Sequence, residues 1–283
     1  MEKNLKCGGL KMKTEDIKVC VLRVGGTNCD YETARAFKEL GTQAEIKHIN
    51  ELAKHGDLLN YNILVLPGGF SFGDYVRSGV IFARSLNAKL GKQMKQFIDE
   101  NRPILGICNG FQILVEYGLL PGFDGTDPYS QATLTTNNPQ GFKCNWVYLK
   151  NENKGNCLFT NKIPQNKILK IPIAHGEGRF LFPVEKEKQY LEKLVDNDML
   201  VFRYCDENGT PANGAYPINP NGAYHDIAGI CNKEGTIFGL MPHPERAMYW
   251  WQEPDWTSKT HTTPYGDGKL LFENIITNVN KTQ

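Results

Sequence analysis

The chain has 283 residues, of which 40% are hydrophobic and 22% charged, so it is long enough to bury a large core and is neither disordered nor fibrous. Its 32 Lys and Arg against 31 Asp and Glu leave a formal net charge of +1, without the basic excess that nucleic acid or an anionic membrane attracts. The longest apolar runs, 17–24 and 63–66, are too short to cross a bilayer, and the N-terminal residues show no apolar stretch with a cleavage site, so we expect no signal peptide. We therefore expect a cytoplasmic protein with neither a nucleic-acid nor a membrane partner.

The first half of the chain alternates apolar strands with amphipathic helices. After a polar stretch at 1–16, which we expect to be a mobile extension, the pattern predicts strands at 17–24, 44–49, 62–66 and 103–107 and helices at 30–40, 51–60, within 78–101, and at 109–117. This alternation is typical of a parallel sheet covered on both faces. We expect an α/β, doubly wound fold in a single domain over residues 17–283.

The second half is richer in strands. Turn-forming residues fill 121–141, and after them we expect strands at 142–149, 168–174, 199–205, 227–232 and 236–241, with helices at 186–196 and 269–280. Between these, residues 248–268 form a long irregular segment that holds three tryptophans. Loops of this length in compact domains are commonly functional or contact a partner.

The cysteines give no sign of a metal motif. Eight are present, and no neighbouring pair has the spacing of a zinc ribbon or a thioredoxin-like motif. We therefore expect no metal site and mostly free, buried thiols.

The strongest local motif is Gly106-Ile107-Cys108-Asn109-Gly110, where an apolar strand meets a helix. A nucleophile on such a turn needs small neighbours, and the N-terminus of the helix favours a thiolate. The backbone N–H of Asn109 is placed to receive an oxyanion. On these residues alone, a buried structural cysteine between glycines stays an equal alternative.

A cysteine nucleophile needs a base and a group that orients it. His175-Gly176-Glu177 and His243-Pro244-Glu245 each place a histidine and a glutamate on one side of an extended backbone. Pro244 favours the second pair because it holds His243 extended. For each pair taken alone, a structural histidine in a turn or loop remains the alternative.

A double-glycine loop, Pro67-Gly68-Gly69-Phe70, also follows an apolar strand. The carboxyl ends of parallel strands gather at one sheet edge, so this loop is expected beside Cys108, with Gly69 or Phe70 as a second oxyanion donor. Phosphate binding is disfavoured because neither a Walker A sequence nor G-x-G-x-x-G is present.

Together these motifs resemble the class I glutamine amidotransferases over about residues 17–276. The sequence motifs that carry the resemblance include PGGFSFGDYVRSG at 67–79, GICNGFQIL at 106–114 and GLMPHPER at 239–246. Two further stretches, IPIAHGEGRF at 171–180 and NPNGAYHDIAG at 219–229, resemble the branch of this family that serves de novo purine synthesis.

The resemblance implies a three-layer, mostly parallel, flavodoxin-like fold with a strand-rich second half. It implies a triad of Cys108, His243 and Glu245. The implied oxyanion hole is formed by Gly69, Phe70 and Asn109, and the implied glutamine-binding residues are Gln112, His175 and Glu177.

The resemblance also implies a reaction and partners. L-glutamine would be hydrolysed, and the ammonia would pass to a separate ATP-dependent synthetase subunit that aminates formylglycinamide ribonucleotide, with a small bridging subunit in the same enzyme. No cofactor is expected in this chain, whereas ATP and magnesium are expected on the synthetase. The alternatives are a stand-alone γ-glutamyl hydrolase or peptidase of the same fold and a catalytically silent interaction module.

Overall fold

The computed structural model describes residues 12–126, 130–260 and 262–280. Residues 1–11 of the expected extension lie outside this range. Thr14–Asp16 form a short 3-10 turn that contacts the rest of the chain, because the Gln43 side chain donates to the Glu15 carbonyl at 2.7 Å and the Asn280 side chain to the Thr14 hydroxyl at 3.1 Å. The packed part of the chain thus starts a few residues before 17.

The predicted alternation in the first half is confirmed. Strands and helices follow one another as β1 (Lys18–Arg23), α1 (Asp30–Glu39), β2 (Gln43–His48), α2 (Ile49–His55), β3 (Ile63–Leu66), α3 (Val80–Asp99), β4 (Ile104–Ile107) and α4 (Asn109–Tyr117). The single helix expected over 51–60 is wrong. Gly56 adopts a left-handed conformation with φ of 74° and ends α2, and a separate 3-10 turn covers Asp57–Asn60.

The second half contains the five expected strands and both expected helices. They are β6 (Lys143–Asn151), β7 (Ile168–His175), α5 (Glu187–Asp196), β9 (Leu200–Cys205), β10 (Ile227–Cys231), β11 (Ile237–Leu240) and α6 (Lys269–Val279). Two strands were not predicted, β5 (Thr133–Thr135) and β8 (Arg179–Leu181), which pair antiparallel in a small sheet of their own. Each has three residues, too few to show a period of two in the sequence.

Within the described residues, nine strands form one sheet, in the order β2-β1-β3-β4-β11-β10-β9-β6-β7. The strands from β2 to β11 are parallel to one another, and the pairings from β11 to β7 are antiparallel. This mixed sheet fits the predicted α/β class. Because β3, β4 and β11 are parallel neighbours, the segments after all three strands meet at one edge of the sheet.

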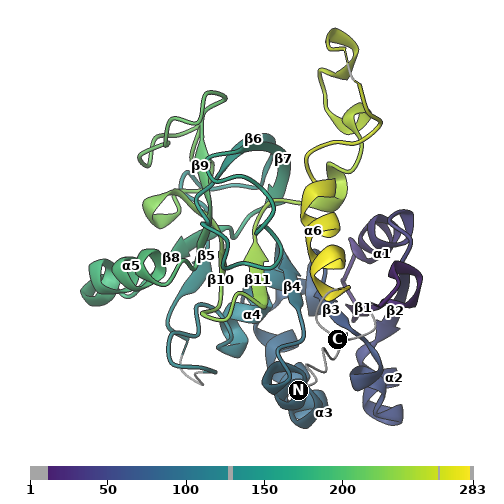
Figure 1. The fold of residues 1–283 in the computed structure, drawn as a ribbon. Helices are drawn as coiled ribbons and strands as arrows, with labels where there is room; N and C mark the ends of the chain where they lie inside the picture. The colour runs from purple at the N-terminus through teal and green to yellow at the C-terminus, as the bar shows by residue number, and fades with distance from the viewer. Residues whose placement is uncertain (1–11, 127–129, 261, 281–283) are drawn as a thin grey trace, which may run out of the picture.

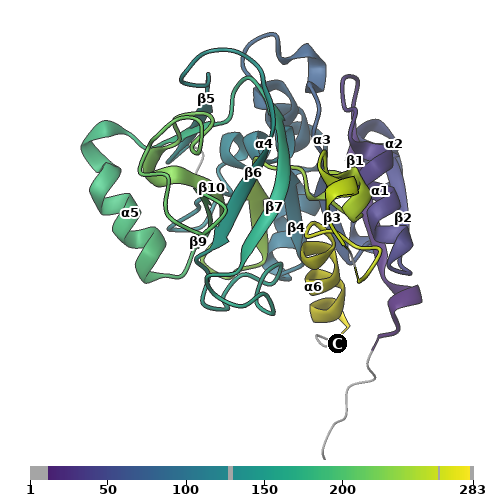
Figure 2. The same cartoon turned by 90° about the horizontal axis from the view of Figure 1, so that it is seen from above.

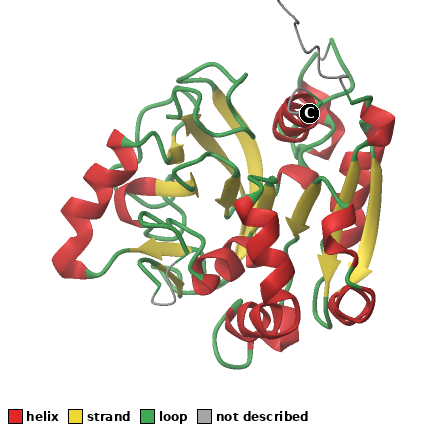
Figure 3. Cartoon of the chain, turned by 60° about the horizontal axis from the view of Figure 1, so that its bottom comes forward, coloured by secondary structure: helices red, strands yellow, loops and turns green. Residues whose placement is uncertain are grey.

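Helices cover both faces of the sheet, with α3 and α4 on one side and α6 on the other (Figure 2). The pair α1 and α6 is joined through Phe37 and Phe272, whose rings lie edge to face at 5.0 Å. All four residues of β3 and of β4 are buried, as expected of central parallel strands. The helix α5 stands at the opposite end of the molecule from α1 and α2 (Figure 3).

The tryptophan-rich segment 248–268 projects above α6 (Figure 1). Its described residues are irregular, as predicted, apart from the 3-10 turns Trp250–Gln252 and Trp256–Ser258 and an isolated bridge between Tyr249 and Tyr265. Lys170 of β7 ties it to the sheet through Glu253 at 3.0 Å and Asp255 at 2.7 Å. Its expected contact with a partner stays a prediction. Among the helices that the structure describes, none combines the length and apolar character needed to span a bilayer.

Candidate active site

Cys108 lies on a strained turn between β4 and α4, as the glycine-flanked motif predicts. Its backbone has φ of 51° and ψ of −105°, and its N–H donates to the Leu240 carbonyl of β11 at 2.8 Å. A Cβ on Gly110 would lie 1.8 Å from the Leu66 carbonyl oxygen, and one on Gly106 would lie 2.6 Å from the Gly110 carbonyl oxygen. The two glycines therefore let α4 approach β3 and β4 closely enough to form the elbow.

Replacing Gly110 with alanine should destabilise the fold by about 3 kcal/mol, because the new methyl group would overlap backbone atoms that cannot rotate away. Gly25→Ala is the matched control, since a Cβ there meets no atom within 4 Å. Urea unfolding of the two variants measures the difference. Equal free energies of unfolding would show that the elbow does not depend on this close approach.

His243 and Glu245 follow β11 and form a buried pair. The Nδ1 atom of His243 lies 2.6 Å from Glu245 Oε1, and the two residues are only 1% and 3% exposed. The His243 N–H donates to the Pro172 carbonyl of β7 at 2.8 Å, which fixes the backbone of the pair. Burial opposes a charge on His243, but the carboxylate of Glu245 and the neighbouring Cys108 raise the pKa of His243 well above its ordinary value.

His243 and Cys108 face each other across Gly68. A Cβ on Gly68 would lie 2.7 Å from His243 Cε1 and 3.4 Å from Cys108 Cβ, so both side chains border the space that this glycine leaves open. With Nδ1 directed to Glu245, the Nε2 atom has no hydrogen-bond partner among the described residues. This is the arrangement of a nucleophile, a base and an orienting carboxylate.

His175 and Glu177 do not form such a pair. His175 Nδ1 lies 3.2 Å from Asn137 Oδ1, whereas the carboxylate of Glu177 accepts from the Ser78 N–H at 3.2 Å. Burial, with the nearby His243, lowers the pKa of His175 to about 3, so its imidazole stays neutral at neutral pH. The two candidate pairs left open by the sequence thus differ in geometry, and only His243 has its glutamate as hydrogen-bond partner.

The lowered pKa of His175 predicts a specific loss of stability in acid. The unfolded chain binds this proton below about pH 6.5 while the folded chain does not, so folding loses up to about 1.4 kcal/mol per pH unit as the pH falls toward 3. Urea unfolding at about pH 7 and about pH 5 should show a smaller loss for His175→Gln than for the unchanged protein. An equal or larger loss in the variant would contradict a neutral, buried His175.

The two oxyanion donors expected in the double-glycine loop are not equivalent. The N–H of Phe70 donates to the Gly26 carbonyl at 2.9 Å, so it is already used. Gly69 has φ of 149° and is packed against Asn28 and Gly26, where a Cβ would lie 2.8 Å from backbone atoms. Of the two, Gly69 therefore stays the candidate donor, and Asn109 stands at the start of α4 as predicted.

Gln112 lies one turn into α4 and is held by two of the other predicted residues. Its amide nitrogen donates to the Glu177 carbonyl at 2.6 Å, and its oxygen accepts from the Asn109 side chain at 2.9 Å. The structure thus brings Asn109, Gln112 and Glu177 together beside Cys108. Their binding of glutamine stays a prediction.

Other residues around the site were not singled out in the sequence. Asn137 contacts the His175 ring and also accepts from the Gly178 N–H at 2.9 Å, and the Ala174 carbonyl lies 3.7 Å from Cys108 Sγ. Cys29 accepts a hydrogen bond from Arg246 at 3.2 Å. These contacts join segments far apart in the chain, so no local spacing could have indicated them.

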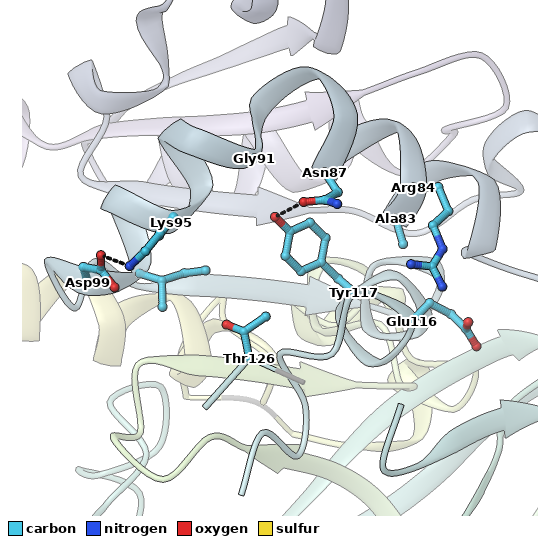
Figure 4. A pocket seen from close by; sticks show the side chains of 10 residues that line it. Ala83, Arg84, Asn87, Gly91, Lys95, Asp99, Glu116, Tyr117 and Thr126 are labelled. Atoms are coloured by element: carbon cyan, nitrogen blue, oxygen red, sulfur yellow. Dashed lines mark hydrogen bonds and ion pairs between the residues drawn. The ribbon is translucent and has the colours of Figure 1, made fainter. Parts of the chain in front are cut away.

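A separate cavity of about 520 Å³ lies against α3 and α4 (Figure 4). Tyr117 donates to Asn87 at 3.3 Å across it, and Lys95 pairs with Asp99 at 2.6 Å near its far end. None of the predicted catalytic, oxyanion or glutamine-binding residues lines this cavity. We therefore centre the candidate site on Cys108 and His243.

The chain is similar to known proteins over most of its length. Residues 16–279 match the CobB/CobQ-like glutamine amidotransferase domain. The chain belongs to this glutamine amidotransferase family. The predicted family resemblance and fold class are thereby confirmed.

Individual members of the family match the chain over most of its length. The phosphoribosylformylglycinamidine synthase subunit PurQ of Archaeoglobus fulgidus is 44% identical over 275 residues, covering 94% of this chain and 98% of that protein. A protein of the same name from Methanococcus maripaludis is 48% identical over 265 residues, covering 93% of each. Among solved structures, a chain of PurLQS from Thermotoga maritima has a TM-score of 0.70 and 32% identity, and the match covers 93% of this chain and 99% of that one.

Proposed function

We propose that the protein is the glutaminase subunit of phosphoribosylformylglycinamidine synthase. It hydrolyses L-glutamine and delivers ammonia to an ATP-dependent synthetase subunit, which converts formylglycinamide ribonucleotide to formylglycinamidine ribonucleotide in de novo purine synthesis. The observation that carries the proposal is Cys108 on its elbow, facing a His243–Glu245 pair joined at 2.6 Å. Relatives named as this subunit and matched over more than nine-tenths of both chains support the choice of pathway.

The first half of the reaction forms a thioester. The Cys108 thiolate attacks the side-chain amide carbon of glutamine, and the N–H groups of Gly69 and Asn109 stabilise the oxyanion. The protonated His243 gives its proton to the departing nitrogen, and ammonia leaves. The raised pKa of His243 suits this step, because Glu245 stabilises the imidazolium that carries the proton.

The second half restores the enzyme. Water attacks the thioester carbonyl carbon while His243 takes a proton from the water. The bond between this carbon and Cys108 Sγ then breaks, which releases glutamate and restores the Cys108 thiolate. His175 takes no proton in this scheme, because its pKa of about 3 keeps the ring neutral. It serves instead, with Glu177 and Gln112, to shape the glutamine side of the site.

The partner and cofactors follow from the same proposal. ATP and magnesium belong to the synthetase subunit, and a small bridging subunit completes the enzyme. We include a cytoplasmic location in the proposal, since the seven described cysteines are all free thiols, as is usual in reducing compartments.

Exposed apolar side chains beside the site fit a surface for the synthetase. Tyr75 and Val76, which follow the double-glycine loop, are 89% and 73% exposed. Phe70 and Phe142 are also exposed, with ring centroids 6.3 Å apart. Apolar groups clustered at the rim of a site are typical of a protein interface.

Val76→Asp should weaken binding of the synthetase subunit by about tenfold or more, because a charge would be buried in the interface. Val184→Asp is the matched control, since Val184 is 83% exposed and begins the turn before the distant helix α5. Titration of each variant with purified synthetase measures the affinity. Equal weakening by both substitutions would place the interface elsewhere.

The proposed function is tested with a diazo-ketone analogue of glutamine, with and without the synthetase subunit. The proposal expects a single adduct on Cys108 that glutamine prevents and that forms faster with the synthetase. Full-rate labelling and hydrolysis without any partner would favour a stand-alone γ-glutamyl hydrolase. Absence of an adduct under both conditions would favour a silent interaction module.

A further inference from the structure

A second thiol, Cys29, lies close to His243. A Cβ on Gly68 would lie 3.1 Å from Cys29 Sγ and 2.7 Å from His243 Cε1, so Cys29 and His243 border the same small space. Cys29, His243 and Glu245 are all buried, and one donor atom of each lies within 4.8 Å of the other two. Among the residues that the structure describes, no other group of three histidine, cysteine or acidic residues is placed in this way.

The donor set suits one class of ligand. Thiolate sulfur, imidazole nitrogen and carboxylate oxygen are the ligands of Zn²⁺, each at about 2.0–2.3 Å from the ion, so donors around one ion stand roughly 3–4 Å apart. A separation of at most 4.8 Å therefore needs only small side-chain movements. One polar atom here, Glu245 Oε2, is buried without a hydrogen-bond partner among the described residues, and such atoms are usually satisfied.

A cavity lies next to Glu245, whose side chain is itself fully buried. Glu245 lines a cavity of about 280 Å³ that also has Glu32, Glu39 and Tyr249 in its wall. Arg246 bonds Cys29 Sγ at 3.2 Å and Glu32, which lines this cavity, at 2.7 Å. Its side chain is 37% exposed, so the guanidinium can turn toward solvent when another cation takes its place at Cys29.

We propose that Cys29, His243 and Glu245 form an inhibitory binding site for Zn²⁺ or a similar thiophilic divalent cation. As the Sγ–metal bond forms, the Cys29 thiol releases its proton to solvent. The bound ion takes His243 and Glu245 out of the triad, so glutamine hydrolysis stops until the metal is removed. That inhibition rests on the proposed function, whereas metal binding does not.

The cysteine spacing in the sequence led us to expect no metal site. Spacing along the chain detects ligands that lie close together in sequence. Cys29 precedes α1 and His243 follows β11, and only the fold brings them together.

Cobalt binding to the Cys108→Ala protein tests the site without any activity measurement. With the catalytic thiol removed, Co²⁺ should still produce thiolate-to-cobalt charge-transfer absorption with one ion per chain. Adding Cys29→Ser should abolish this absorption, whereas adding Cys144→Ser should not, because Cys144 is exposed and lies in β6. Loss of the band in Cys108→Ala alone, or its persistence after Cys29→Ser, would overturn the proposal.

Arg246→Met provides a variant whose expected effect is a gain. Removal of the competing guanidinium should tighten cobalt binding several-fold, a result that a poorly folded protein would not give. Weaker or unchanged binding in this variant would contradict a site that includes Cys29.

Zinc inhibition of glutamine hydrolysis tests the consequence. Zn²⁺ should inhibit, a chelator should restore the rate, and Cys29→Ser should require about tenfold more zinc, measured against its own metal-free rate. Equal zinc sensitivity of the two proteins would overturn the inhibitory role. A chain without any glutaminase activity would contradict the proposed function, and the cobalt result would still decide the metal site.

Discussion

Cys108→Ala should reduce glutamine hydrolysis by at least about 10⁴-fold, because it removes the nucleophile that forms the thioester. The loss should appear in the maximal rate, since the alanine side chain leaves the glutamine-binding groups in place. Steady-state glutaminase assays of the assembled enzyme measure it.

The same variant separates glutamine use from ammonia use. In the complete enzyme, synthesis driven by added ammonia should persist with Cys108→Ala, because the synthetase then receives its nitrogen directly. Cys144→Ala, a substitution of an exposed cysteine, should leave both activities unchanged. Loss of ammonia-dependent synthesis in Cys108→Ala would show that Cys108 supports the assembly as well as, or instead of, the hydrolysis.

Local signals in the sequence predicted the elbow because the residues that form it are neighbours in the chain. Gly106 and Gly110 flank Cys108, and their close approaches to backbone atoms leave no room for a Cβ. The buried strands before it and the helix after it were also readable from short-range periodicity. The predicted secondary structure was wrong where a single residue or a distant segment decides it. Gly56 ends α2 earlier than expected, and the three-residue strands β5 and β8 form only by pairing with each other.

The choice between the two histidines shows the same limit. Pro244 gave a modest local reason to prefer His243, but the decisive contacts are long-range. The parallel pairing of β11 with β4 brings His243 to Cys108, and the Ser78 N–H, two residues before α3, binds the Glu177 carboxylate away from His175. Neither contact can be read from the residues around the histidine itself.

His243→Ala should therefore lower glutamine hydrolysis by about 10⁴-fold, as removal of a triad base does. His175→Ala should lower it by no more than about 10²-fold, the effect expected when substrate-positioning groups shift slightly. The comparison uses the assembled enzyme at saturating glutamine, so that weaker substrate binding by His175→Ala does not enter the rate.

Each variant also predicts a different pH dependence. His175 stays neutral because of its lowered pKa, so its removal should leave the shape of the pH–rate profile unchanged. Glu245→Gln removes the carboxylate that raises the pKa of His243, so the His243 titration should move to lower pH while the rate falls. A profile that shifts with His175→Ala and not with Glu245→Gln would make His175 the base, and the 2.6 Å pair of His243 and Glu245 would then be a structural contact.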